Sequence, residues 1–369
     1  MKKIRAFFFG FVWWKRRQMR RFFPELDIRF CRTLEEARRG GLGSGDRIYL
    51  WGKREIGEIE EYARGEGIAL YRVEDGFIRS VSLGSDLTPA YSLVADSRGI
   101  YFDPTSPSDL EEILNHATMD HRLLERAKRL RRYIVERKLS KYNPFAEVTL
   151  ELPGHRPGQR VVMVPGQVED DASIRYGAPE MDNLTLLRRA RESAPEAYIV
   201  YKPHPDVLAG NRRGAVEEKE AKRYCDAIVT EASIDSVLER ADEVHTMTSL
   251  VGFEALLRGK RVYTYGMPFY AGWGLTEDAR RCERRKRRRS LDELVAAAYI
   301  LYPRYLDPQS GALCEVETLL KSLEALKARY DSDRFYRLAI DLRNGVSRKL
   351  QRGWRKLLES SEKLPSFRV

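Results

Sequence analysis

Two short motifs, far apart in the chain, carry residue types that could do chemistry. Residues 74–76 read Glu-Asp-Gly, and residues 202–205 read Lys-Pro-His-Pro. Apolar stretches rich in strand-forming residues precede both motifs, at residues 68–73 and 197–201, so each motif is predicted to follow a β-strand. In open α/β folds, ligands bind beyond the carboxyl ends of parallel strands, and we therefore expect both motifs to face one shared cleft.

The first motif offers two adjacent carboxylates. Because neighbouring side chains on a strand point to opposite faces, Glu74 and Asp75 are not expected to act on the same atom. We expect one to face the cleft while the other anchors the turn, with Gly76 allowing the backbone to bend sharply. A carboxylate in this position can attack the anomeric carbon of a sugar or deprotonate an acceptor. A solvated Asp-Gly turn is the alternative interpretation.

The second motif presents a histidine between two prolines. Pro203 and Pro205 restrict the backbone around His204 to an extended shape. A rigidly held imidazole at a strand end can hydrogen-bond or protonate a leaving phosphate. A structural loop histidine is the alternative.

Hydroxyl side chains precede a further predicted helix. Thr248 and Ser249 are candidate caps for the helix that follows them, which we expect to end at Gly259. Their hydroxyls and the free N–H groups of the first helical turn would together form a phosphate site. An ordinary helix cap is the alternative. Glu254, inside this helix, could reach a ribose or remain a plain helical glutamate.

The chain offers little sign of a metal site or of disulfides. Asp170 and Asp171 form an acidic pair, but it lacks a histidine partner and the spacing of a calcium loop, so we expect no metal. The four cysteines have neither a CxxC pairing nor metal-ligand spacing, which is typical of free thiols in a reducing compartment. The longest apolar stretch, residues 6–14, is too short to span a bilayer. We therefore expect a cytoplasmic protein, with peripheral attachment to the inner membrane left open.

The charge of the chain favours a polyanionic partner. With 66 basic and 55 acidic residues the net charge is +11, which suits nucleic acid, anionic lipid or a phosphorylated substrate. Residues 280–289 contain eight basic residues, and we expect either a solvated basic loop or a surface for anionic lipid or a polyanionic acceptor. Nucleic acid is disfavoured because no nucleic-acid-binding motif is present.

Residues 334–354 show a basic amphipathic helical pattern, suited to packing back on the protein, to a linker or to a membrane surface.

The elements that must position these residues alternate between strand and helix. This rhythm predicts an α/β fold with parallel sheets. Residues 152–158 are rich in turn-forming residues and are the expected domain boundary. We therefore expect two facing Rossmann-like domains, in a GT-B-like arrangement: residues 1–150, which carry Glu74, Asp75 and Gly76, and residues 151–330, which carry His204, Thr248 and Ser249. A basic helical tail or linker, residues 331–369, is expected to follow.

Four segments together resemble a known family. They are residues 73–80 (VEDGFIRS), 202–205 (KPHP), 245–256 (HTMTSLVGFEAL) and 265–276 (YGMPFYAGWGLT). The series resembles the KpsC/LipB capsule polysaccharide family, the bacterial retaining β-Kdo glycosyltransferases, over residues 4–325. The first three segments are also similar to those of bacterial CMP-sialic acid transferases, which need no metal.

The resemblance implies a metal-independent enzyme that uses CMP-Kdo. It would add β-Kdo to the poly-Kdo linker that joins a capsule polysaccharide to lyso-phosphatidylglycerol. The implied partners are CMP-Kdo, a Kdo-terminated glycolipid acceptor, the anionic membrane surface and a second tandem transferase module; nucleic acid is not among them. Because CMP-Kdo carries β-configured Kdo, a β product means net retention.

The resemblance also implies residue roles. Asp75 would be the nucleophile that forms a covalent Kdo-enzyme, and His204 would assist the departure of CMP. Gln167 and Arg79 are expected near the sugar, with Arg79 pairing with its carboxylate. The remaining donor-binding residues are expected to be Lys202, Thr248 and Ser249 around the phosphate and Glu254 near the ribose.

Three questions stay open from the sequence. Family members of the KpsC type carry two such modules in tandem, whereas this chain has room for one, so the linkage made, β2→4 or β2→7, is undetermined. A related CMP-sialic acid or other nucleotide-sugar transferase is one alternative. A non-catalytic, membrane-associated scaffold is the other.

Overall fold

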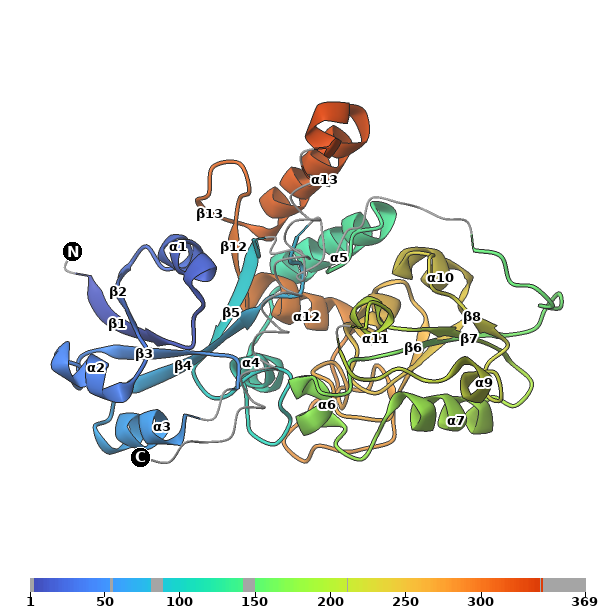
Figure 1. Ribbon diagram of the computed structural model, residues 1–369, viewed down its shortest axis with the longest axis horizontal. Coiled ribbons are helices and arrows are strands. Elements are labelled where there is room, and N and C mark those ends of the chain that lie inside the picture. Colours follow the sequence, from blue (N-terminus) through green and yellow to red (C-terminus); the bar gives the residue numbers. More distant parts are fainter. Residues whose placement is uncertain are drawn as a thin grey trace, which may run out of the picture.

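The computed structural model describes residues 3–53, 56–80, 89–141, 150–210, 212–338 and 340. Two α/β halves lie side by side, each built around its own sheet (Figure 1). The first sheet has the strand order β13-β12-β5-β4-β3-β1-β2 and the second the order β11-β10-β9-β6-β7-β8. The mixed α/β class expected from the sequence is confirmed.

The first sheet has a parallel part and an antiparallel part. Strands β2, β1, β3 and β4 run parallel, as the alternating pattern predicts. Strand β5 pairs antiparallel with β4, and β12 and β13 continue the antiparallel part. The strands are β1 (Ile4–Phe9), β2 (Leu26–Cys31), β3 (Arg47–Trp51), β4 (Ala69–Asp75), β5 (Ser92–Asp96), β12 (Arg304–Leu306) and β13 (Leu313–Cys314).

Helices cover both faces of the first sheet, so its central strands are buried on both sides. Phe8 packs against Tyr49 on one face, whereas Phe7 and Phe9 belong to a separate apolar cluster on the other. This double burial explains the continuous apolar run in β1. The helices of this half are α1 (Trp13–Phe22), α2 (Leu34–Arg39), α3 (Gly57–Gly65), α4 (Asp109–His116) and α5 (His121–Glu136).

The second sheet is parallel throughout its described strands. Its strands are β6 (Val161–Pro165), β7 (Tyr198–Lys202), β8 (Ala227–Ile228), β9 (Glu243–Thr246), β10 (Arg261–Thr264) and β11 (Glu277–Asp278). The helices that follow the domain boundary are α6 (Ala172–Gly177), α7 (Asn183–Ser193), α8 (Pro205–Leu208), α9 (Glu218–Ala221), α10 (Ile234–Arg240), α11 (Leu250–Leu257), α12 (Leu291–Val295), the π-helix η2 (Ala296–Leu301) and α13 (Val316–Ser332).

The chain returns to the first sheet near its end. After η2, strand β12 pairs with β5, and β13 pairs with β12. A domain division at residue 150 therefore separates residues 304–314 from the first sheet, although these residues complete that sheet. Helix α13 ends at Ser332, and most of the expected basic tail lies outside the described residues.

The two halves share an apolar core. Phe77, just after β4, packs against Phe253 of α11, Phe269 and Tyr299. All four rings are buried. The loop that follows Asp75 is therefore anchored to the second half by aromatic contacts.

The basic run at residues 280–289 is not simply a solvated loop, and that expectation is wrong for two of its arginines. Arg285 is buried and donates to the carbonyls of Pro268 and Ala271, at 2.5 and 2.7 Å, and to the carboxylate of Glu111. Arg289, also buried, donates to the carbonyl of Leu114 at 2.5 Å. Cations are stabilised at the carboxyl end of a helix by its unpaired carbonyls, and α4 supplies such an end. These side chains join the halves of the molecule.

Candidate active site

Asp75 lies at the carboxyl end of β4, held between two cations. Arg79 Nε donates to Asp75 Oδ2 at 2.7 Å, and Lys15 Nζ lies 3.6 Å from Oδ1. Burial alone would raise the pKa of Asp75, but the charges of Arg79 and Lys15 outweigh it and hold that pKa below its ordinary value. Asp75, whose side chain is 15% exposed, therefore stays ionised at neutral pH.

The neighbouring residue Glu74 bonds the backbone. Its Oε1 accepts from the N–H of Asp75 at 2.9 Å. Burial, together with the charge of Asp75, raises the pKa of Glu74 to about 7. The two neighbouring carboxyls thus have pKa values pushed in opposite directions, a separation that is common at functional sites.

Gly76 lies close against the neighbouring strand β5. It does not take the left-handed backbone conformation. A Cβ at this position would collide with the side chain of Ser92 on β5. Close approach of the adjacent strand therefore excludes a side chain here.

Lys15 is a site residue that the motif search missed. It reaches from α1 to Asp75, and its ammonium lies 3.2 Å from the centroid of the Trp51 ring. Burial lowers the pKa of Lys15, although the nearby carboxylates oppose the shift. Its spacing to the buried Met19 and Phe22, four and seven residues further on, places it on the inward face of α1. This helical spacing was the feature of the sequence that could have identified Lys15 as a site residue.

In the second half, Gln167 organises the start of α11. Its Oε1 accepts from the N–H groups of Thr248 and Ser249, at 3.0 and 3.1 Å, and its Nε2 donates to Thr248 Oγ1 at 3.0 Å. Ser249 is the N-cap and accepts from Val251 N at 3.2 Å. The expected cap is thus present. At this helix start the N–H of Ser249 is already bonded to Gln167 and the N–H of Val251 to the Ser249 hydroxyl, so a phosphate here would have to replace one of these contacts or use the remaining hydroxyl and N–H groups.

Lys202 is the last residue of β7, and His204 lies two residues further on. Lys202 is 6% exposed, and burial lowers the pKa of its ammonium to about 8. Nδ1 of His204 accepts from the N–H of Asp206 at 3.1 Å, and burial lowers the pKa of the imidazole. The ring is therefore neutral at pH 7, and because Nδ1 is an acceptor, its proton is on Nε2.

Glu254 lies where the two halves meet. It is 4% exposed, and its Oε1 accepts from the backbone N–H of Lys141 at 3.0 Å. The carbonyl of Lys141 in turn accepts from the N–H groups of Arg79 and Ser80. Burial raises the pKa of Glu254 to about 7. The contact seen for Glu254 thus connects α11 to the loop that carries Arg79.

The charge of Lys141 connects the predicted residues of the two halves. It lowers the pKa of Glu74, of Asp75 and of His204. Hydrogen bonds also link the two regions in sequence: the N–H of Gly166 donates to the carbonyl of Lys202, the next residue Gln167 bonds the start of α11, and Glu254 of α11 bonds the backbone of Lys141.

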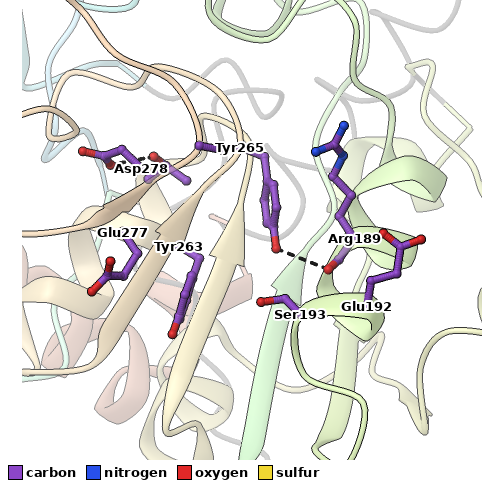
Figure 2. Close-up of a pocket in the computed structure, with 9 residues that line it drawn as sticks. Arg189, Glu192, Ser193, Tyr263, Tyr265, Glu277 and Asp278 are labelled. Atoms are coloured by element: carbon purple, nitrogen blue, oxygen red, sulfur yellow. Dashed lines mark hydrogen bonds between the residues drawn. The ribbon is translucent and has the colours of Figure 1, made fainter.

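A hollow lies elsewhere on the molecule. It is a groove of about 450 Å³ on the second half, where the hydroxyl of Tyr265 donates to the backbone carbonyl of Arg189 in α7 (Figure 2). None of the predicted site residues lines it. Within the described ranges, no group of His, Cys, Asp and Glu side chains could hold a metal ion, and no helix is long and apolar enough to cross a bilayer.

Comparisons with known proteins give the family. The model of the family described as capsule polysaccharide biosynthesis protein matches residues 46–152 and 147–305, more than half of the chain. The chain belongs to this family, as the resemblance of its motifs predicts. The capsule polysaccharide modification protein LipA of Neisseria meningitidis serogroup A is 46% identical over 317 residues. That match covers 85% of this chain and 44% of LipA, so the chain spans less than half the length of this relative.

Two solved structures share the fold over almost their whole length. The β-Kdo 2,7 transferase of Thermosulfurimonas dismutans KpsC is 39% identical, with a TM-score of 0.71, and the match covers 87% of this chain and 99% of that one. The β-Kdo 2,4 transferase of the same KpsC is 34% identical, with a TM-score of 0.77 and coverage of 88% and 98%. This chain is therefore similar in extent to one transferase unit.

Proposed function

We propose that this chain is a retaining β-Kdo transferase that uses CMP-β-Kdo, in a GT-B-like arrangement, to extend a poly-Kdo linker on lyso-phosphatidylglycerol. The likeness to both KpsC transferases supports the transfer of Kdo. The observation that carries the proposal is Asp75, a largely buried and ionised carboxylate at the carboxyl end of a parallel strand.

In the first step Asp75 attacks the anomeric carbon of Kdo. A bond forms between a carboxylate oxygen and that carbon, and the bond from the carbon to the phosphate oxygen of CMP breaks, with the electron pair leaving on CMP. In the second step an acceptor hydroxyl attacks the same carbon and its proton passes to solvent, while the bond between that carbon and the Asp75 oxygen breaks and its electron pair restores the carboxylate. Two displacements at one carbon give net retention.

Arg79 can act in both steps by pairing first with Asp75 and then with the carboxylate of Kdo. In the free enzyme it keeps Asp75 ionised through the contact at 2.7 Å. Once Asp75 is esterified its charge is gone, and the buried guanidinium needs another anion. The carboxylate of Kdo, which is bonded to the reacting carbon, is the anion at hand. The proposed role of Arg79 at the sugar carboxylate is compatible with its contact to Asp75.

His204 and Lys202 suit the leaving phosphate. A neutral imidazole with its proton on Nε2 donates a hydrogen bond, so we assign His204 to hydrogen bonding of the phosphate rather than to full proton transfer. Lys202, buried and with its pKa lowered by that burial, gains a counter-ion when CMP binds. Thr248 and Ser249 offer hydroxyls on the same side. No metal is required by this scheme.

The test is release of CMP from CMP-Kdo with a Kdo-terminated glycolipid acceptor, in the absence of added metal. CMP-sialic acid and UDP-sugars serve as donor controls. Acceptor-dependent release from CMP-Kdo alone, with a Kdo adduct on Asp75 detected by mass spectrometry of a quenched reaction, is the expected result. Turnover of another donor would refute the Kdo assignment, and release without any Asp75 adduct would refute double displacement. Silence with every donor on the intact protein would favour a non-catalytic scaffold.

A further inference from the structure

An exposed tryptophan pair begins α1. Trp13 is 77% and Trp14 45% exposed, and their rings lie 5.8 Å apart at 90°. Tryptophan is one of the residues that folded proteins bury most on average. Two adjacent exposed indoles therefore indicate a contact surface rather than ordinary surface composition.

The pair stands at the sheet edge that carries Asp75. Helix α1 directly follows β1, and β1 runs parallel to β4 in the same sheet, so both strands end at the same edge. The next residue, Lys15, contacts Asp75 at 3.6 Å. Adding one Cα–Cα step and an extended lysine side chain places the backbone of Trp14 within about 14 Å of the Asp75 carboxylate. A short saccharide can span that distance.

The face of α1 that carries the pair is basic. Arg17, Arg20 and Arg21 are exposed, and α1 contains no acidic residue. Helical spacing places Arg17 one turn from both tryptophans and Arg21 one turn further. An anionic ligand bound along this face would contact the indole rings at the start of the helix and the guanidinium groups one and two turns further along it.

We propose that Trp13 and Trp14 form the platform for the acceptor sugar. An indole ring stacks on a pyranose face of the acceptor, and Arg17 pairs with the carboxylate of that sugar. This inference rests on the proposed function, which supplies a carboxylated acceptor. It extends that function to residues outside the nucleophile and donor motifs.

The structure favours a saccharide over a bilayer as the occupant. A helix that lies in a membrane surface needs an apolar stripe along its length. The remaining large apolar residues of α1, Met19 and Phe22, are buried in the core of the first half. The exposed apolar area is confined to the end of α1 nearest Asp75, where a flat bilayer would cover the nucleophile.

The experiment compares Trp13→Ala and Trp14→Ala with Phe335→Ala. Phe335 is 85% exposed and serves as a matched aromatic control away from the sheet edge. Calorimetric titration with a soluble Kdo-terminated oligosaccharide measures acceptor affinity without turnover. The expected result is about a tenfold weaker acceptor affinity in each tryptophan variant, with no change for Phe335→Ala. Trp14→Phe is expected to recover most of the affinity.

The outcomes separate this inference from the proposed function. Absence of CMP release from the unaltered protein would refute the function, whereas unchanged acceptor affinity in both tryptophan variants would refute the platform. Donor hydrolysis without acceptor is expected to be unchanged in these variants. Loss of sedimentation with phosphatidylglycerol vesicles, at unchanged acceptor affinity, would overturn the saccharide assignment in favour of a membrane contact.

Discussion

The strand end at Asp75 and the start of α11 differ in how completely their polar atoms are hydrogen-bonded. At Asp75, one carboxylate oxygen is bonded to Arg79, while Oδ1 has no hydrogen-bond partner among the described residues and lies 3.6 Å from the ammonium of Lys15. At α11, the amide of Gln167 meets both Thr248 and Ser249 with good geometry. An unpaired buried oxygen marks a group with capacity left for a ligand, whereas a saturated network marks a rigid support.

From this contrast we expect the two halves to have different functions. The strand end in the first half holds two adjacent carboxyl groups whose pKa values are shifted in opposite directions, which suits bond making and breaking. The second half presents a preformed frame of hydroxyls and amide groups, which suits holding a phosphate in place. Substitutions in the first region should therefore affect rate, and substitutions in the second should affect stability and donor binding.

The largest effect is expected from Asp75→Asn. The amide lacks the nucleophilic charge, so transfer should fall by about a thousandfold or more while the fold persists. CMP release measures the loss, and circular dichroism checks folding. Asp46→Asn, at another buried aspartate that pairs with an arginine, is the control and should retain activity. Full activity of Asp75→Asn would contradict the division of labour between the two regions.

Gln167→Met should mainly destabilise the protein. The change leaves the N–H groups of Thr248 and Ser249 without their acceptor, which should lower the free energy of unfolding by about 3 kcal/mol. Urea denaturation gives the value. Gln309→Met, at an exposed position, should have almost no effect. An unchanged midpoint for Gln167→Met would show that the network at α11 is not a structural frame.

Glu254→Gln should remove a pH dependence of stability. Burial raises the pKa of Glu254 to about 7 in the folded state, so the folded protein keeps a proton that the unfolded chain loses near pH 4.5. Stability contributed by this group is therefore present at low pH and lost as pH rises toward 7, by about 3 kcal/mol at most. Glutamine can still accept from Lys141 N, so the variant should show a flatter profile in urea denaturation across pH 5–8. A profile equal to that of the unaltered protein would contradict this.

The smallest effect is expected from Lys15→Met. Loss of the ammonium removes a charge that lowers the pKa of Asp75, so that pKa should rise. The acidic limb of the rate profile should move to higher pH, with a fall of about tenfold in rate at neutral pH. Lys222→Met, at an exposed lysine that pairs only within its own helix region, is the control. An unchanged acidic limb would show that Lys15 does not set the pKa of Asp75 during catalysis.

Local sequence patterns predicted most elements near Asp75 and His204, because strand and helix periodicities depend on neighbours in the chain. The strands predicted at residues 68–73 and 197–201 are β4 and β7, and the predicted cap Ser249 accepts from the N–H of Val251. Strand β5 went unpredicted, although it supplies the contact that requires glycine at position 76. The roles predicted for the site residues stay predictions that the experiments above address.

The sequence by itself determined the alternation of strands and helices, the two motifs at strand ends and the family. Each of these depends on residue types within a short window. The tertiary structure alone decided that Lys15 reaches Asp75, that Gln167 occupies the start of α11 and that Glu254 bonds the backbone of Lys141. It also decided that Arg285 and Arg289 are buried and that β12 closes the first sheet. These contacts join residues from 60 to more than 200 positions apart, and such pairings follow from how the sheets stack and cross, which no local periodicity encodes.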